Sequence, residues 1–187
     1  FAYTSDNPNF SSLSPKGLAR LMRGIGQYRR ERRGMMTSNF AECGGFLKTR
    51  ADLDAPDIQL HFGMAVTEDH GRKRHGNGFS CHVCLLRPKS RGTVTLKNAD
   101  PLANPLIDPN FLGEDEDLET MVAGYKTTRR LMETPAMRGL QTRDLFTADV
   151  KTDDDIRAIL RARVDTVYHP VGTCRMGEDP RAVVDSR

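Results

Sequence analysis

Histidines are the side chains of this sequence best suited to moving protons near neutral pH, because imidazole titrates close to pH 6.5. The five are His61, His70, His75, His82 and His169. His169 has the most constrained surroundings: Pro170 favours an extended backbone at His169, and Gly172 and Gly177 permit sharp turns beyond it. An imidazole held at a turn suits a group that accepts or donates a proton. A plain structural turn is the alternative, and His61, on an expected strand, is by itself more typical of a structural histidine.

Four cysteines offer a second kind of chemistry. Cys81-His82-Val83-Cys84 contains one CxxC pair, whereas a strong zinc signal needs two; Cys43 and Cys174 stand alone, and only His70 and His75 could complete a site. On a strand, residues three apart point to opposite faces and lie about 10 Å apart. That separation suits neither a disulfide nor a shared metal. The sequence therefore predicts structural, reduced cysteines and no metal site, with a zinc-stabilised module as the alternative hypothesis.

Motifs for nucleotides and for activated serine are missing from these 187 residues. Gly24-Ile25-Gly26 begins like a dinucleotide fingerprint, but its third glycine is replaced by Arg29 and it lies inside a helical pattern. No GKS or GKT phosphate loop and no GxSxG elbow is present. The run of basic residues at 29–33 is typical of a solvated helix end, so we expect no nucleic-acid partner.

The elements that must position these residues follow from hydrophobic periodicity. A helix is expected from Pro15, capped by Ser14, after an irregular lead-in at residues 1–13. Further helices are expected from Asp115 to about Glu133 and from Thr152 onward. Between them the pattern predicts strands at Ala41–Leu47, Ile58–Val66, Gly78–Leu86, Thr93–Leu96 and Leu106–Ile107. Strands in one block between helices indicate an α+β fold: a largely antiparallel sheet of five or six strands with helices packed on one face.

Composition bounds the class of protein. The chain has 37% hydrophobic residues and a formal net charge of +3, which fits one globular domain and not a disordered chain. No run of about 18 apolar residues and no signal peptide is visible, and four cysteines are too few for a disulfide scaffold. The chain begins at Phe1 and stops after Ser186-Arg187, so we expect it to be a piece of a larger protein.

Several segments together carry a family resemblance. YHPVGTCRMG at 168–177 closely resembles the histidine motif of the glucose–methanol–choline (GMC) family of flavin-dependent alcohol oxidoreductases. PKSRGTV at 88–94, NPLIDPN at 104–110, residues 117–124 and TPAM at 134–137 are similar to the same family in its order and spacing. The likeness covers most of the chain and points to choline dehydrogenases and their alkanol-oxidising relatives.

The resemblance implies an enzyme that oxidises a primary alcohol to an aldehyde by hydride transfer to FAD. His169 is then the catalytic residue beside the flavin, with Tyr168 and Pro170 as its cofactor-contacting neighbours, and His61 contacts the substrate. The implied substrate is choline or an aliphatic alcohol. A zinc-stabilised module and a non-catalytic interaction domain remain the competing functions.

The resemblance also implies a domain organisation. Residues 1–187 correspond to the substrate-binding domain, residues 167–187 lead back towards the flavin domain, and the Rossmann-like FAD-binding domain is absent from this sequence. We therefore expect this piece to hold FAD poorly and to be inactive alone. The whole protein is expected in the cytoplasm, with peripheral association with the inner membrane left open, as are its oligomeric state and electron acceptor.

Overall fold

A computed structural model describes the protein except for residues 9, 11–14, 67–75 and 186, and it leaves out the side chains of residues 15 and 16. The cap expected at Ser14 and the loop histidines at 70 and 75 lie outside the described residues. In chain order the elements are β1 (Ala2–Thr4), α1 (Pro15–Glu31), the 3-10 helix η1 (Met35–Thr37), β2 (Cys43–Leu47), β3 (Ile58–Gly63), β4 (Gly78–Leu85), β5 (Thr93–Thr95), β6 (Leu106–Asp108), α2 (Asp115–Met132), α3 (Pro135–Arg138), β7 (Arg143–Asp144) and α4 (Asp153–Arg163).

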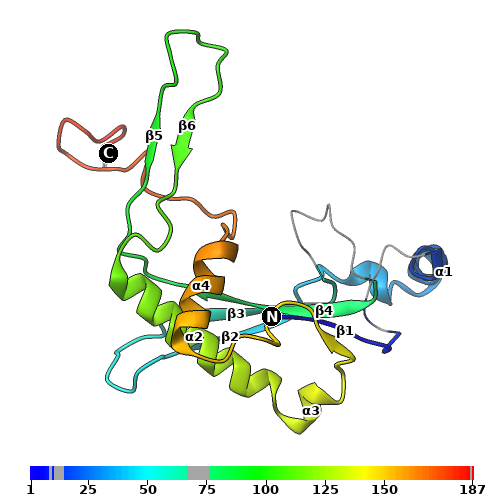
Figure 1. The fold of residues 1–187 in the computed structure, drawn as a ribbon. Helices are drawn as coiled ribbons and strands as arrows, with labels where there is room; N and C mark the ends of the chain where they lie inside the picture. Colours follow the sequence, from blue (N-terminus) through cyan, green and yellow to red (C-terminus); the bar gives the residue numbers. More distant parts are fainter. Residues whose placement is uncertain (9, 11–14, 67–75, 186) are drawn as a thin grey trace.

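The main sheet has five strands in the order β2-β3-β4-β1-β7, and every neighbouring pair is antiparallel. Strands β5 and β6 form a separate two-stranded hairpin that projects away from the body (Figure 1). The α+β class and the largely antiparallel sheet predicted from the sequence are confirmed. The predicted strands and helices are all present, with ends that differ by at most three residues, but β5 and β6 pair with each other and not with the main sheet.

Helix α2 covers one face of this sheet, and the core lies between them. A Cβ added at Gly124 of α2 would lie 3.1 Å from Val83 Cγ2 and 3.3 Å from Ile58 Cγ2, so helix and sheet approach closely here because position 124 has no side chain. Leu118 and Met121 of α2 pack in the same layer. Helix α4 then packs on α2 through Ile156.

Two helix starts follow the expected rules. Thr152 caps α4 in a reciprocal capping box with Asp155, as the acidic first turn and the threonine indicated. At α2, buried Asp117 accepts hydrogen bonds from the backbone N–H groups of Lys89 and Ser90, both at 2.8 Å, and from the Ser90 hydroxyl. Asp117 thereby ties the loop after β4 to the helix.

Three features differ from the sequence-based expectation. Residues 2–4, assigned to an irregular lead-in, form strand β1 near the centre of the sheet, where Tyr3 pairs with Phe79. The two-residue strand β7 at the edge was not predicted, because so short a segment has no periodicity. Helix α1, predicted as one of the helices on the sheet, packs among the described elements against η1 alone and stands at the end of the sheet (Figure 1).

None of the described helices is both long enough and apolar enough to cross a membrane.

Candidate functional site

The face of the sheet opposite α2 carries the polar side chains. On β3 and β4, neighbouring residues point to alternate faces, and Ile58 and Val83 point toward α2. His61 and His82, which are one residue out of phase, therefore share the opposite face. Since His61 and His82 are direct partners in the antiparallel register, their Cβ atoms are expected about 5 Å apart.

On the side of β2, few side chains lie beside His61 and His82. Gly44 is the partner of His61 on that strand, and a Cβ there would lie 2.2 Å from the carbonyl oxygen of Leu60. A glycine is therefore required, and it leaves no side chain beside His61 in that direction. Phe46, two residues further along β2 on the same face, is 61% exposed.

A hydrogen-bond chain fixes the orientation of His82. The Ser80 hydroxyl donates to the carbonyl oxygen of Ala65 at 2.9 Å, and Ser80 Oγ lies 3.0 Å from His82 Nε2. Because the single hydroxyl proton is used on Ala65, Ser80 Oγ must accept from His82 Nε2–H. This assigns the proton to Nε2 and makes Nδ1 the acceptor nitrogen of the ring.

The surroundings of His82 favour the neutral form of its ring. Burial of the ring lowers the pKa of His82 to about 4, although the residue as a whole is exposed. A neutral imidazole with a directed acceptor nitrogen can bind a hydroxyl or water donor. The sequence did not identify His82 as a candidate binding residue, because its position beside His61 depends on the pairing of β3 with β4 and no local pattern indicates it.

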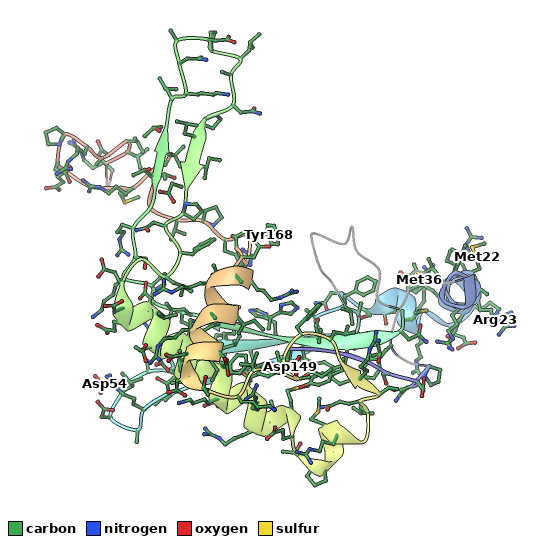
Figure 2. The ribbon with its side chains drawn as sticks, in the orientation of Figure 1. Met22, Arg23, Met36, Asp54, Asp149 and Tyr168 are labelled. Carbon is green, nitrogen blue, oxygen red and sulfur yellow. The ribbon has the colours of Figure 1, made fainter. Side chains whose placement is uncertain are left out.

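His169 lies in a different setting, in the segment 164–187 that follows α4. Tyr168 has a φ of 64°, and its backbone N–H donates to Thr166 Oγ at 2.9 Å, so the chain turns just before His169. Gly172 has a φ of 102°, which an L side chain would strain, so a second sharp change of direction follows. Figure 2 labels Tyr168 beyond the C-terminal end of α4.

The side chains of Tyr168, His169 and Pro170 are all exposed. The imidazole of His169 is therefore not enclosed in the core, and the local turn is the feature that presents it. Among the described residues, no hydrogen bond joins His169 to the imidazole of His61 or His82, and no described pocket contains both groups.

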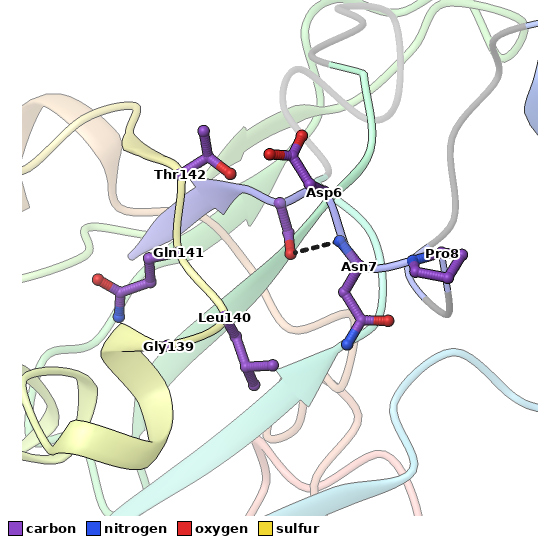
Figure 3. A pocket seen from close by; sticks show the side chains of 8 residues that line it. Asp6, Asn7, Pro8, Gly139, Leu140, Gln141 and Thr142 are labelled. Carbon is purple, nitrogen blue, oxygen red and sulfur yellow. Dashed lines mark hydrogen bonds between the residues drawn. The ribbon is translucent and has the colours of Figure 1, made fainter.

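The two described hollows lie elsewhere. Ser5–Pro8 and Gly139–Thr142 line an open cleft of about 440 Å³, shown in Figure 3, where Ser5 Oγ accepts from Asn7 N. A second hollow of about 260 Å³ lies between Tyr3, Arg129 and Asp144. Neither is lined by His61 or His169.

The cysteines are separated as strand geometry predicts. Cys81 is buried in the core with Phe79, whereas Cys84 is out of phase with it on β4 and points to the other face. Burial raises the pKa of the Cys81 thiol to about 11, so this thiol is protonated and unreactive at neutral pH. Within the described ranges, no three His, Cys, Asp or Glu side chains gather where they could hold a metal ion.

Comparisons with known proteins now decide the family. The family profile described as GMC oxidoreductase matches residues 88–187, more than half of the chain. The chain belongs to the GMC oxidoreductase family. It is 47% identical over 176 residues to an alcohol dehydrogenase [acceptor] of Pseudomonas putida, covering 93% of this chain and 31% of that protein. It is 39% identical over 155 residues to the oxygen-dependent choline dehydrogenase of Burkholderia thailandensis, covering 82% of this chain and 27% of that protein.

The GMC resemblance inferred from the sequence motifs is thus confirmed, and the chain spans about a third of the length of these curated relatives. Solved structures support the GMC fold. Pyridoxine 4-oxidase of Mesorbium loti superposes with a TM-score of 0.71 at 21% identity, covering 99% of this chain and 32% of that one. A variant of Aspergillus oryzae formate oxidase studied for its FAD modification gives 0.73 at 22% identity, covering 94% of this chain and 36% of that one.

Proposed function

We propose that this chain forms the substrate side of an FAD-dependent alcohol dehydrogenase that oxidises a primary alcohol to an aldehyde. The observation that carries the proposal is the match of residues 88–187, which include the turn around His169, to the GMC family. The polar face with His61 and His82 lies opposite α2, on a rigid antiparallel pair. A rigid polar face and a separately presented imidazole are suitable parts for one interdomain alcohol site.

His169 is the proposed catalytic residue. In this role its imidazole accepts the hydroxyl proton of the alcohol while the carbon loses hydride, and it stabilises the developing alkoxide until that transfer is complete. An exposed ring on a constrained turn suits the task, since a group from the other part of the protein must reach it. Tyr168 and Pro170, which flank it and are exposed, are the proposed contacts to the cofactor.

The described residues fit one end of FAD only. Tyr168 and Val171 present aromatic and aliphatic surface that a planar flavin ring could cover, with exposed fractions of 64% and 93%. The phosphate end finds no counterpart, because Gly24-Ile25-Gly26 lies inside helix α1 instead of in a loop after a strand. When bound, FAD supplies the hydride acceptor. We therefore assign FAD to the whole protein and propose that residues 1–187 alone bind it weakly and do not turn over.

A neutral primary alcohol fits the polar face with His61 and His82 better than choline. Its described side chains include Phe46, Gln59, His61 and His82, and no carboxylate lies among the residues that share this face on β2, β3 and β4. A quaternary ammonium group prefers an aromatic cage with a carboxylate nearby. The proposed preference agrees with the higher identity to the Pseudomonas protein named an alcohol dehydrogenase. We propose a cytoplasmic location for the catalytic part.

The test is His169→Ala in the whole protein that carries this chain. Bound flavin should remain near one per protein while kcat for a primary alkanol falls by about a hundredfold to ten-thousandfold, the range for loss of an acid–base group. The matched control is His61→Ala, which should raise KM more than it lowers kcat. Alkanol oxidation at the wild-type rate by the His169 variant would contradict the catalytic assignment. Absence of flavin from the wild-type whole protein would contradict the proposed function itself.

A further inference from the structure

Helix α1 is an unusual element because its apolar stripe is not buried. A Cβ added at Gly24 would lie 3.0 Å from Met35 Cγ and 3.6 Å from Met36 Cγ of η1, and Arg20 donates to the carbonyl oxygen of Pro8 at 2.9 Å, so the helix is held on one side. Among the described elements only η1 packs against it. Figure 1 shows α1 at the end of the sheet, away from α2 and α4. The remainder of its surface is open.

The open surface includes an apolar stripe at helical spacing. At 100° per residue, Leu18, Leu21, Met22 and Ile25 fall within an arc of about 100°. Leu18 is 59% and Met22 63% exposed, whereas the stripe of a surface helix normally faces the core. Met36 of η1, which lies beside Gly24, extends this apolar surface. In Figure 2 Met22 lies beside α1 at the far end of this unit, and Met36 lies at η1, nearer the sheet.

Positive charge is concentrated along the same helix. Residues 15–33 contain seven of the 28 basic residues and one of the 25 acidic residues of the chain. The segment is therefore strongly basic, whereas the remainder of the chain is net negative. At the same spacing, Arg29 falls within the arc of the stripe, whereas Arg23 and Arg30 lie about 80–100° beyond its edge, on the polar side of the helix, and Arg23 is exposed (Figure 2). Their long side chains can reach polar headgroups while the stripe is immersed.

We propose that α1 and η1 form a membrane-docking surface that binds an anionic lipid bilayer in the plane of its interface. The combination of an exposed Leu and Met stripe with an arginine-rich polar side is the pattern of interfacial helices, in which apolar burial and attraction to anionic headgroups act together. A nucleic acid would use the arginines and leave the stripe exposed, so the stripe favours lipid. The proposal does not depend on the catalytic assignment of His169.

The experiment is sedimentation of the whole protein with vesicles of phosphatidylcholine, alone or with 30 mol% phosphatidylglycerol (roughly the anionic fraction that gives a strong surface potential). Binding is expected only with the anionic lipid, and salt should weaken it. Two variants test the two parts of the surface: Leu18→Ser with Met22→Ser, and Arg23→Glu with Arg30→Glu. Each pair should lower the partition coefficient by about tenfold or more.

Matched controls come from the β5/β6 hairpin, which also exposes apolar and basic residues. Leu96→Ser with Leu102→Ser removes two side chains that are 85% and 91% exposed, and Lys97→Glu reverses one charge there. These variants should bind vesicles like the wild type, and circular dichroism should show that all variants remain folded. Alkanol oxidation in detergent should be the same in all of them.

Four outcomes would overturn the proposal. The wild type does not bind anionic vesicles; the hairpin variants lose binding while the α1 variants keep it; the Leu18 and Met22 variant binds as well as the wild type, which indicates a purely ionic surface; or that variant loses solubility or folding without lipid, which indicates that another part of the protein covers the stripe.

Discussion

The two histidine-bearing regions of this protein are held by different means. His82 lies on a central pair of strands, with its ring nitrogen on Ser80 and its neighbours set by the register with β3. His169 lies on an exposed segment after α4, where a positive φ at Tyr168 and the ring of Pro170 define a turn. The first is positioned by contacts between distant parts of the chain and the second by local backbone restrictions.

The two regions are therefore expected to contribute differently to the stability and to the activity of the protein. Strands β3 and β4 contribute buried side chains to the core, so a substitution on these strands is expected to affect folding as well as binding. The segment 164–187 contributes few buried side chains, so a change there should affect chemistry and leave the free energy of unfolding nearly unchanged. The predictions below test this separation, beginning with the largest effect.

Asp117→Asn should strongly destabilise the body of the protein. Although burial of the Asp117 carboxyl opposes it, hydrogen bonds from Lys89 N and from Ser90 hold its pKa below the ordinary value of 3.8. An amide accepts fewer of these bonds and places an N–H group against backbone donors. We expect a loss of about 3 kcal/mol in the free energy of unfolding at pH 7, measured by urea denaturation.

The pH dependence of this loss has a definite sign. A carboxyl whose folded pKa is lowered stabilises the fold above its unfolded pKa and loses that contribution as the pH falls through the lowered value. The difference between wild type and Asp117→Asn should thus be full at pH 7 and shrink below pH 3.8. Glu116→Gln is the control, since the exposed pair of Glu116 with Lys89 is worth about 1 kcal/mol or less. Equal losses in both variants would contradict the anchoring role.

Pro170→Ala should act on the exposed segment alone. Removing the ring lets the backbone at His169 leave the extended region, so the imidazole is presented correctly for a smaller fraction of the time. In the whole enzyme we expect kcat to fall about tenfold, with a change in unfolding free energy of about 1 kcal/mol or less. Pro180→Ala, in the same exposed segment, is the control. A larger change in stability than in kcat would show that the turn is part of the core.

Thr152→Ala tests a purely local contribution to the stability of the part of the protein that contains the sheet and α4. The Thr152 hydroxyl accepts from Asp155 N at 3.1 Å, and Asp155 accepts from Thr152 N at 2.8 Å. Loss of the cap should cost about 1 kcal/mol, seen as a lower thermal midpoint with unchanged KM. Thr173→Ala, in the exposed segment, should leave the midpoint unchanged. A shift in that control as large as in Thr152→Ala would remove the contrast between the two regions.

The same contrast explains how far the sequence could predict the molecule. Helix α2 and strands β3 and β4 were predictable because their periodicity is long and their ends carry clear signals, such as the acidic residues at 115–117. Strand β1 was missed because Ala2–Thr4 has only three residues, and its place beside β4 depends on pairing with residues almost 80 positions away. His82 was not identified as a candidate site residue for the same reason: its position beside His61 depends on the pairing of β3 with β4.

The family motif around His169 was predictable because it is local in sequence, and its turn is local in structure. The placement of the segment 164–187 relative to the sheet could not be predicted, because no short-range pattern in the sequence defines it. Helix α1 was predicted correctly as a helix, but its packing was not, since an amphipathic stripe in the sequence does not tell which surface it faces.

The role of His82 can be tested with two substitutions. Each of them keeps the hydrogen-bonding role of one ring nitrogen and removes that of the other. Gln at position 82 can still donate to Ser80 but has no acceptor at the position of Nδ1, whereas Asn places an oxygen near that position and loses the bond to Ser80. If Nδ1 accepts from the bound alcohol or from a water beside it, His82→Gln should raise KM about threefold with kcat unchanged, in line with loss of one neutral hydrogen bond. His82→Asn should keep KM within twofold of the wild type.

The opposite pattern would assign His82 to the structure of the sheet. If His82→Asn lowers the thermal midpoint and raises KM while His82→Gln has the wild-type KM, then the bond to Ser80 is the important contact and Nδ1 has no ligand. A pH series separates the roles further. Because the folded pKa of His82 is lowered to about 4, its protonation opposes folding, so the wild type should lose stability as the pH falls from about 6.5 to 4. Both variants lack this titrating group and should lose less stability over that range, whatever their KM.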